Sequence, residues 1–157
     1  MPKSEHLLWR SEQDTARWAT RLARAPALRN AFITLQGDLG AGKTSFVRHL
    51  LRALGVTGHI KSPTYTVVEP HEAPDGLAIW HFDFYRFQDP HELEDAGLHE
   101  LLAESGLKLA EWPEHAEALL PTPDLALAFE ITGETARRVT VTAGTDTGSA
   151  ILRNLNP

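Results

Sequence analysis

The stretch GDLGAGKT, from Gly37 to Thr44, comes directly after the apolar run AFITLQ, and an amphipathic segment follows it. It satisfies the pattern G-x-x-x-x-G-K-[S/T], in which the glycines let successive backbone N–H groups turn inward around phosphate oxygens. A chance match inside a turn is the alternative interpretation. The order of strand, glycine loop and helix is the context that phosphate binding requires, because the start of the helix adds a positive dipole end. The stretch therefore predicts a nucleotide phosphate site.

Two side chains of this loop have predicted roles in the chemistry. Lys43 is expected to reach the β- and γ-phosphates, and the hydroxyl of Thr44 is expected to ligate Mg²⁺. The rest of the predicted cradle consists of Gly37, Asp38, Leu39, Gly40, Ala41 and Gly42.

The apolar pattern predicts one α/β domain over residues 1–157, with residues from about 145 as a flexible or loosely packed tail. Helices are expected over 11–27, 45–54, 90–97 and 113–120. Strands are expected over 31–36, 65–69, 77–83 and 107–111, and a late antiparallel hairpin over 125–131 and 137–143. We therefore predict a P-loop NTPase-like three-layer sandwich with a mixed, mainly parallel central sheet.

Composition restricts the class of protein. Of the 157 residues, 42% are hydrophobic and 23% are charged, which is typical of a soluble globular protein. The chain has no cysteine, so disulfides, zinc–thiolate sites and thiol catalysis are excluded. No segment resembles a signal peptide or approaches the roughly 18 apolar residues of a membrane span, so we expect a cytoplasmic protein with no membrane contact. The net charge of −6 disfavours strong direct binding to nucleic acid.

A magnesium site needs a second anchor beside the loop. Asp83 ends the apolar segment IWHFD and matches an acidic residue that holds the metal directly or through water, although an aspartate that caps the next turn is the alternative. Glu111 ends the segment LKLAE, and ligands lie at strand ends in open α/β sheets. Glu111 is expected to polarise an attacking water or to join the metal shell, unless it is a surface residue at a helix start. Trp112 shields the site or only packs.

The polar segment SPTYT, residues 62–66, connects the helix after the loop to the next strand. In several nucleotide switches a threonine in this connection approaches the metal and the γ-phosphate, and Thr64 is the candidate for that role. A proline-containing turn is the alternative. His71, His81 and His91 recur every ten residues, which is not a metal-ligand spacing, so we interpret the histidines as surface or packing residues.

Several classes of nucleotide-binding protein fit these residues. The chain lacks the N-K-x-D and D-x-x-G motifs of GTPases, which favours ATP over GTP. A small-molecule kinase commonly closes an arginine-bearing lid over the phosphates, whereas Arg86 is the only arginine between Arg52 and Arg137. A regulatory subunit, whose nucleotide state controls a partner enzyme, also fits the residues, and so does a nucleotide sensor that never hydrolyses its ligand.

Four segments together resemble one bacterial family, the TsaE (YjeE) family. They run from about Phe32 to His115 and are GDLGAGKTSFVRHLLRALG, KSPTYTVVEPH, HFDFYRFQDPHELEDAGL and LAEWPEH. The phosphate loop alone is generic, but its combination with SPTYT, HFDFYR and EWPE in this order is specific. Ala110 before Glu111 and His71 after Pro70 are mild departures from the family pattern, and neither touches the predicted chemistry.

The resemblance implies a function in tRNA modification. Members of this family are ATPases needed to make N6-threonylcarbamoyladenosine beside the anticodon of tRNAs that read ANN codons. They work with TsaD, which transfers the threonylcarbamoyl group, and with TsaB, a scaffold partner of TsaD. For this chain the resemblance implies ATP and Mg²⁺ as cofactors, TsaD and TsaB as partners, and tRNA held through that complex. It also implies that the ATP cycle resets the TsaB–TsaD complex. Because no arginine finger is evident in the sequence, we expect slow intrinsic hydrolysis that partner binding completes.

The resemblance also assigns roles to residues. The implied catalytic residues are Lys43, Thr64, Asp83 and Glu111. The implied metal ligands are Thr44, Asp83 and Glu111. To the nucleotide-binding loop the resemblance adds Ser45 beside the α-phosphate, Trp112 beside the motif glutamate, and Thr15, which follows Asp14 in the first helix.

Overall fold

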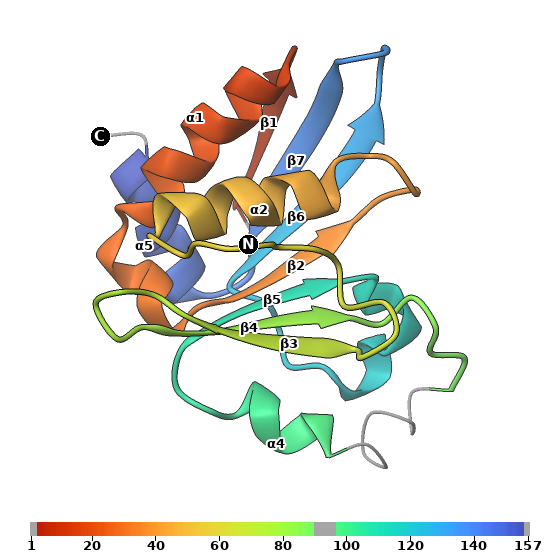
Figure 1. Cartoon of the computed structure of the whole chain (residues 1–157). Helices are drawn as coiled ribbons and strands as arrows, with labels where there is room; N and C mark the ends of the chain where they lie inside the picture. Colours follow the sequence, from red (N-terminus) through yellow and green to blue (C-terminus); the bar gives the residue numbers. More distant parts are fainter. Residues whose placement is uncertain (1–2, 90–96, 156–157) are drawn as a thin grey trace.

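The computed structural model describes residues 3–89 and 97–155, and its centre is a seven-stranded sheet in the order β1-β7-β6-β2-β5-β4-β3 (Figure 1). The strands are β1 Lys3–Trp9, β2 Phe32–Gln36, β3 Val68–Glu72, β4 Ala78–Asp83, β5 Leu107–Glu111, β6 Leu125–Ile131 and β7 Arg137–Ala143. The three inner pairings, β6 with β2, β2 with β5, and β5 with β4, are parallel, and the three outer pairings are antiparallel. Of these strands only β7 and β3 run against the others, so the sheet is mixed and mainly parallel, as predicted.

Strands β2 and β5 form the middle of the sheet and position the site. Phe32 to Leu35 and all of β5 are buried, as expected for strands that are covered on both faces. In the register, Leu35 of β2 and Asp83 of β4 are each opposite Glu111 of β5. The carboxyl ends of these three parallel strands therefore meet at one edge of the sheet, where ligands bind in open α/β folds.

Three helices cover one face of the sheet: α1 Glu12–Ala23, α2 Lys43–Ala53 and α5 Asp146–Leu155 (Figure 1). Helix α1 begins at the N-cap Ser11, whose side chain accepts a hydrogen bond from the Asp14 N–H. Helix α2 begins after Gly42, whose left-handed φ of 104° suits glycine. The buried stripes of α1 and α2 meet the sheet through an aromatic cluster of Trp9, Trp18, Phe46 and Phe129.

A smaller apolar layer covers the other face. It contains α4 Leu98–Leu102 and the short 3₁₀ segments η2 Pro113–His115 and η3 Glu117–Leu119. Phe82, Phe84 and Ala110 are buried in this layer together with Leu98 and Leu102. Because successive side chains of a strand point to opposite faces, Phe82 packs here while Ile79 packs under the helices. The three-layer arrangement is confirmed.

The two ends of the chain differ from the prediction. Residues from about 145 were expected to form a loose tail, but Asp146–Leu155 is the amphipathic helix α5, with Ile151, Leu152 and Leu155 buried. The Leu155 carbonyl accepts a hydrogen bond from the Arg21 guanidinium of α1. At the other end, β1 was not predicted, and it pairs along its length with β7. Both terminal segments are therefore part of the packed fold.

Three internal elements also differ in position or type. The predicted strand over 65–69 has the wrong bounds, because the strand is Val68–Glu72. It begins later because Val67, with φ 69°, closes a turn in which its N–H donates to the Pro63 carbonyl oxygen at 2.6 Å. The helix predicted over 11–27 ends at Ala23 and is followed by η1 Pro26–Asn30. The helix predicted over 113–120 is instead the pair η2 and η3. The helical stretch predicted over 90–97 lies outside the described residues except at its last residue, Gly97, which is the N-cap of α4.

None of the helices within the described residues has the length and apolar character to cross a bilayer. The late hairpin, β6 with β7, is antiparallel as predicted. Its turn lies beside the phosphate loop, so the outer half of the sheet contributes to the site.

Candidate nucleotide-binding site

The phosphate loop depends on glycine at two positions in particular. At Gly37, φ is 154°, and a Cβ atom would lie 2.8 Å from the Phe129 carbonyl oxygen of β6. Gly42 has φ 104° and begins α2. A side chain at either position would strain the backbone, because L-residues rarely adopt such φ values. The loop is therefore pressed against β6 and turns sharply into the N-terminus of α2.

Lys43 is buried in the cleft and is held by contacts that do not neutralise its charge. Its Nζ atom donates to the Gly37 carbonyl oxygen and lies 3.4 Å from the ring centroid of Trp112. Burial lowers the pKa of Lys43 by removing water from the ammonium, and nearby carboxylates, with Glu111 foremost, oppose this shift. The ammonium is thus poorly hydrated and close to where an anion would enter the loop.

Thr44 and Glu111 are brought together across the cleft. The Thr44 hydroxyl donates to Oε1 of Glu111 at 2.8 Å, although 67 residues separate them in the chain. Thr44 lies in the first turn of α2, and Glu111 is the last residue of β5. The residues predicted as a magnesium-associated pair are therefore in direct contact.

Asp83 lies at the end of β4 beside this pair and is bound by the segment that contains Thr64. The hydroxyls of Ser62 and Thr64 both donate to Oδ2 of Asp83, the latter at 3.2 Å, and Ser62 also lies 3.4 Å from Oε2 of Glu111. Oδ1 of Asp83 accepts from the Tyr85 N–H at 2.9 Å. Asp83 therefore both caps the following turn and faces the cleft, so the two interpretations of this residue are compatible.

His81 belongs to the site, although the sequence interpretation placed the histidines at the surface or in packing. Its Nε2 atom lies 2.6 Å from Oε2 of Glu111, and both side chains are buried. An ionised carboxylate only accepts hydrogen bonds, so Nε2 donates to it. The available signal was the strand period: His81 and Asp83 are two residues apart on β4 and so share a face.

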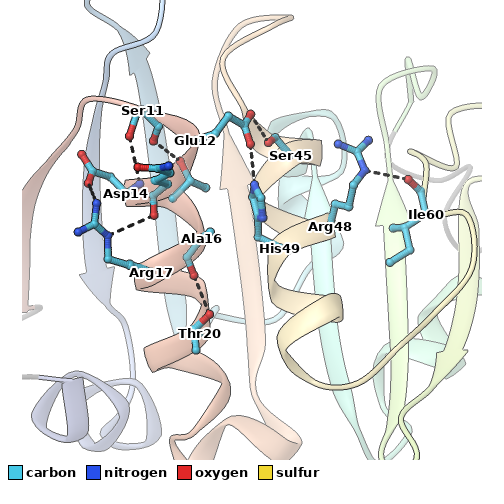
Figure 2. Close-up of polar contacts among 12 residues, drawn as sticks. Ser11, Glu12, Asp14, Ala16, Arg17, Thr20, Ser45, Arg48, His49 and Ile60 are labelled. Atoms are coloured by element: carbon cyan, nitrogen blue, oxygen red, sulfur yellow. Dashed lines mark hydrogen bonds and ion pairs between the residues drawn. The ribbon is translucent and has the colours of Figure 1, made fainter.

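Glu12 is a second residue that the sequence did not single out. As Figure 2 shows, its carboxylate reaches from the start of α1 to α2, where it accepts from Ser45 Oγ at 2.7 Å and lies 2.6 Å from His49 Nε2. The hydrogen bonds from His49 and then Ser45 lower the pKa of Glu12. A negative side chain is therefore bound to the hydroxyl that was predicted to lie beside the α-phosphate.

The remaining predicted residues lie on either side of the loop. Trp112 has φ 57° and packs on Tyr85, with ring centroids 5.0 Å apart. Thr15 is buried in α1, and its hydroxyl lies 3.5 Å from the Ser11 carbonyl oxygen. Thr15 is not in the cleft that holds Thr44 and Glu111. It lines a neighbouring cavity of about 250 Å³, between α1 and the turn of the β6–β7 hairpin.

The main cleft has a volume of about 410 Å³, in the range of small-ligand sites. It is lined by Glu12, Leu39, Gly40, Gly42, Lys43, Thr44, Ser45, Ser62, Thr64, Asp83, Tyr85, Glu111, Trp112 and Arg137. Thr44, Asp83 and Glu111 offer the hard oxygen ligands that Mg²⁺ prefers. Within residues 3–89 and 97–155, no group of three or more histidine, aspartate or glutamate side chains forms a metal cluster. A magnesium ion here would take few protein ligands, as is usual for Mg²⁺ bound with phosphates and water.

A comparison with known protein families identifies the family of this chain. The family model "Threonylcarbamoyl adenosine biosynthesis protein TsaE" matches residues 9–139, most of the chain. The chain belongs to the TsaE family. This TsaE chain is 39% identical over 120 residues to the tRNA threonylcarbamoyladenosine biosynthesis protein TsaE of Haemophilus influenzae, which covers 76% of this chain and 75% of that protein. It is 36% identical over 141 residues to the Bacillus subtilis protein of the same name, covering 88% and 87% of the two chains.

The solved structures agree with the sequence relatives. The crystal structure of B. subtilis YdiB superposes on this TsaE chain with a TM-score of 0.82 at 29% identity, and the match covers 99% of this chain and 95% of YdiB. The α/β fold of the P-loop type, predicted from the order of strands and helices around the phosphate loop, is confirmed. The predicted membership of the TsaE family is likewise confirmed.

Proposed function

We propose that this chain binds and slowly hydrolyses ATP with Mg²⁺, as a subunit of the machinery that forms N6-threonylcarbamoyladenosine in tRNA. The observation that carries the proposal is the Thr44–Glu111 hydrogen bond of 2.8 Å, with Lys43 and Asp83 in the same cleft. Hydroxyl and carboxylate oxygens meet there beside a loop of backbone N–H groups. The family to which the chain belongs supports the tRNA part of the proposal.

The proposed roles follow from where each side chain lies. Gly37 to Thr44 and Ser45 hold the phosphates, and Lys43 places a positive charge on the β- and γ-oxygens. Thr44, Asp83 and Glu111 hold Mg²⁺, which when bound offsets negative charge on the phosphate oxygens. Thr64 responds to the γ-phosphate, a role that its hydrogen bond to Asp83 at the cleft supports. Thr15 and Trp112 flank the loop. Thr15 lies on the side of the neighbouring cavity, and Trp112 lies on the side of Lys43.

Hydrolysis requires a water that is oriented toward the γ-phosphate. Glu111 accepts from Thr44 and from the buried His81, so its carboxylate is held firmly. A held carboxylate orients a water or ligates the metal equally well, and both roles of Glu111 remain in the proposal. Slow turnover follows if a partner must complete the site, as arginines supplied in trans do in other phosphate-loop enzymes. TsaD and TsaB are the proposed partners, and they hold the tRNA.

The experiment compares hydrolysis and binding in the same preparations. ATP turnover by the purified chain is measured alone and with TsaB and TsaD, and a pull-down of the two partners is run with and without ATP. The proposal predicts ADP and free phosphate as products, with a rate that the partners raise. Transfer of the γ-phosphate to a metabolite would instead favour the small-molecule kinase. Binding of ATP with no hydrolysis, even with the partners present, would favour a nucleotide sensor.

A further inference from the structure

Arg137 is the first residue of β7, and its guanidinium joins two loops. It donates to the carbonyl oxygens of Ala41 through Nε at 3.0 Å and of Gly40 through Nη2 at 3.2 Å. On its other side, Nη1 donates to the carbonyl oxygens of Gly133 and Ala136 at 3.0 and 2.8 Å. Four hydrogen bonds thus tie the turn of the β6–β7 hairpin to the phosphate loop.

The carbonyl groups that Arg137 binds determine where the loop N–H groups point. In a trans peptide the C=O of one residue and the N–H of the next point in opposite directions, and none of the described peptides is cis. Because the Ala41 carbonyl points to Arg137, the Gly42 N–H points away from it. The Ala41 N–H belongs to the same peptide group as the Gly40 carbonyl. It closes a turn by donating to the Asp38 carbonyl oxygen at 3.0 Å. Arg137 therefore fixes the Gly40–Ala41 and Ala41–Gly42 peptide groups of the loop.

The charge of Arg137 is also not cancelled locally. All four acceptors are neutral carbonyl groups, and within the described part of the chain no carboxylate forms an ion pair with it. The guanidinium is half-buried and lines both the main cleft and the cavity beside Thr15. An arginine whose charge is retained beside a phosphate site stabilises bound anions.

We propose that Arg137 is a positioning residue of the phosphate loop: it holds the Gly40 and Ala41 carbonyl groups outward, so that the loop is already formed before a phosphate enters. The inference rests on the proposed function, because it assumes that the loop binds a polyphosphate. It adds a requirement that the loop sequence does not contain. The G-x-x-x-x-G-K-[S/T] segment needs a planar, forked donor from a strand about 100 residues later in the chain.

The test compares Arg137→Gln and Arg137→Lys with Arg138→Gln as the matched control. Arg138 is the next residue on β7, and its side chain is 55% exposed and lies 3.6 Å from Glu130. Its replacement removes the same charge without touching the loop. Dissociation constants for inorganic pyrophosphate and for ADP are measured by calorimetry with Mg²⁺ present, and folding is checked by circular dichroism and urea denaturation. The wild-type chain must bind both ligands for the proposed function to hold.

The expected result is a weakening of about tenfold or more for both Arg137 variants, by the same factor for pyrophosphate and for ADP. The lysine variant keeps the charge but cannot bind four carbonyl groups, so it restores little. Arg138→Gln binds as the wild type does. The inference is overturned if folded Arg137→Gln binds pyrophosphate normally, if Arg137→Lys restores full affinity, or if ADP alone is weakened. It is also overturned if both Arg137 variants are unfolded, since Arg137 would then act on the hairpin rather than on the loop. If the wild type fails to bind pyrophosphate or fails to bind ADP, that result counts against the proposed function instead.

Discussion

The Nε2 atom of His81 lies 2.6 Å from Oε2 of Glu111, and both side chains are buried behind the cleft. This contact leaves Oε1 of Glu111 to the Thr44 hydroxyl. The carboxylate therefore faces the proposed metal position with one oxygen and is anchored through the other. Partners of this kind orient metal ligands in many proteins.

Replacement of His81 by alanine is expected to weaken the Mg²⁺-dependent part of ADP binding by about tenfold or more, because Glu111 loses its anchor. Binding of ADP in the presence of a chelator should change little. His81→Gln, which keeps a donor, should recover part of the loss. Calorimetric titrations of ADP with and without Mg²⁺ measure this difference. His71→Gln is the control, since the Nε2 atom of His71 on the neighbouring strand β3 has no described partner. An unchanged Mg²⁺ effect in His81→Ala would contradict the anchoring role.

Glu111→Gln is expected to separate binding from turnover. The amide keeps the size of the side chain but removes the charge that faces Thr44, so ATP hydrolysis should fall by about 100-fold or more. ADP binding without Mg²⁺ should stay within about twofold of the wild type, because the phosphate loop is intact. Turnover is measured by phosphate release with TsaB and TsaD present. Full activity of this variant would remove Glu111 from both of its proposed roles.

The lowered pKa of Lys43 predicts a pH dependence of nucleotide binding. Burial disfavours the charged ammonium, so in the free protein Lys43 loses its proton at lower pH than an ordinary lysine. Bound phosphate favours the charged form of Lys43. At a pH above the lowered pKa of the free protein, ADP binding therefore takes up a proton. The affinity for ADP falls as the pH rises through this pKa. Calorimetry of ADP binding between about pH 7 and pH 10, in buffers of different ionisation enthalpy, measures the uptake. Lys43→Arg should bind with no such proton uptake, because arginine stays charged.

Glu12→Gln is expected to strengthen ADP binding by up to about fivefold, a small effect because the Glu12 side chain is 71% exposed. The wild-type carboxylate binds Ser45 at the N-terminus of α2 and so competes with a phosphate for the same donor. The amide removes the negative charge while retaining an acceptor. Raising the salt concentration should reduce the difference between variant and wild type. Glu130→Gln, an exposed glutamate of β6, serves as the comparison. Weaker binding by Glu12→Gln would show that Glu12 supports the loop rather than competing with its ligand.

Ile151→Ala is expected to lower the free energy of unfolding by roughly 2–5 kcal/mol, because Ile151 is fully buried in α5. Urea denaturation followed by circular dichroism measures the loss. Arg153→Ala, on the exposed side of the same helix, should change stability by about 0.5 kcal/mol or less. Equal stability of the two variants would restore the interpretation of residues 145–157 as a loose tail.

The parts of the fold that local sequence determines were predictable. Residues 37–44 specify their own turn through glycine, and the apolar runs on either side specify β2 and α2. Asp83 and Glu111 were identifiable because each ends an apolar run, which places it at the edge of the sheet where strands β4 and β5 end. The two strands are parallel neighbours, and their register sets Asp83 opposite Glu111.

Residues that act across long sequence distances were missed. Glu12 and Arg137 approach the loop from α1 and β7, and no local pattern shows that these elements lie beside it. His81 was compared with other histidines along the chain, whereas its partner is Glu111 on the next strand. Strand β1 was missed because it carries polar side chains on much of its length. It is an edge strand, and edge strands lack the apolar run that marks a central strand. Helix α5 was missed because Gly, Thr and Asn in its sequence are poor helix formers, yet its buried face packs under η1 and β7.

Pairing of β1 with β7 joins residues 3–9 to residues 137–143. A growing polypeptide leaves the ribosome from its amino end, so the first strand emerges long before its only described neighbour in the sheet has been synthesised. Contacts between such distant segments form late and slowly. The hairpin that carries Arg137 is synthesised at the same stage as this neighbour, so we expect a growing chain to acquire its affinity for polyphosphate only after residues 137–143 have been made.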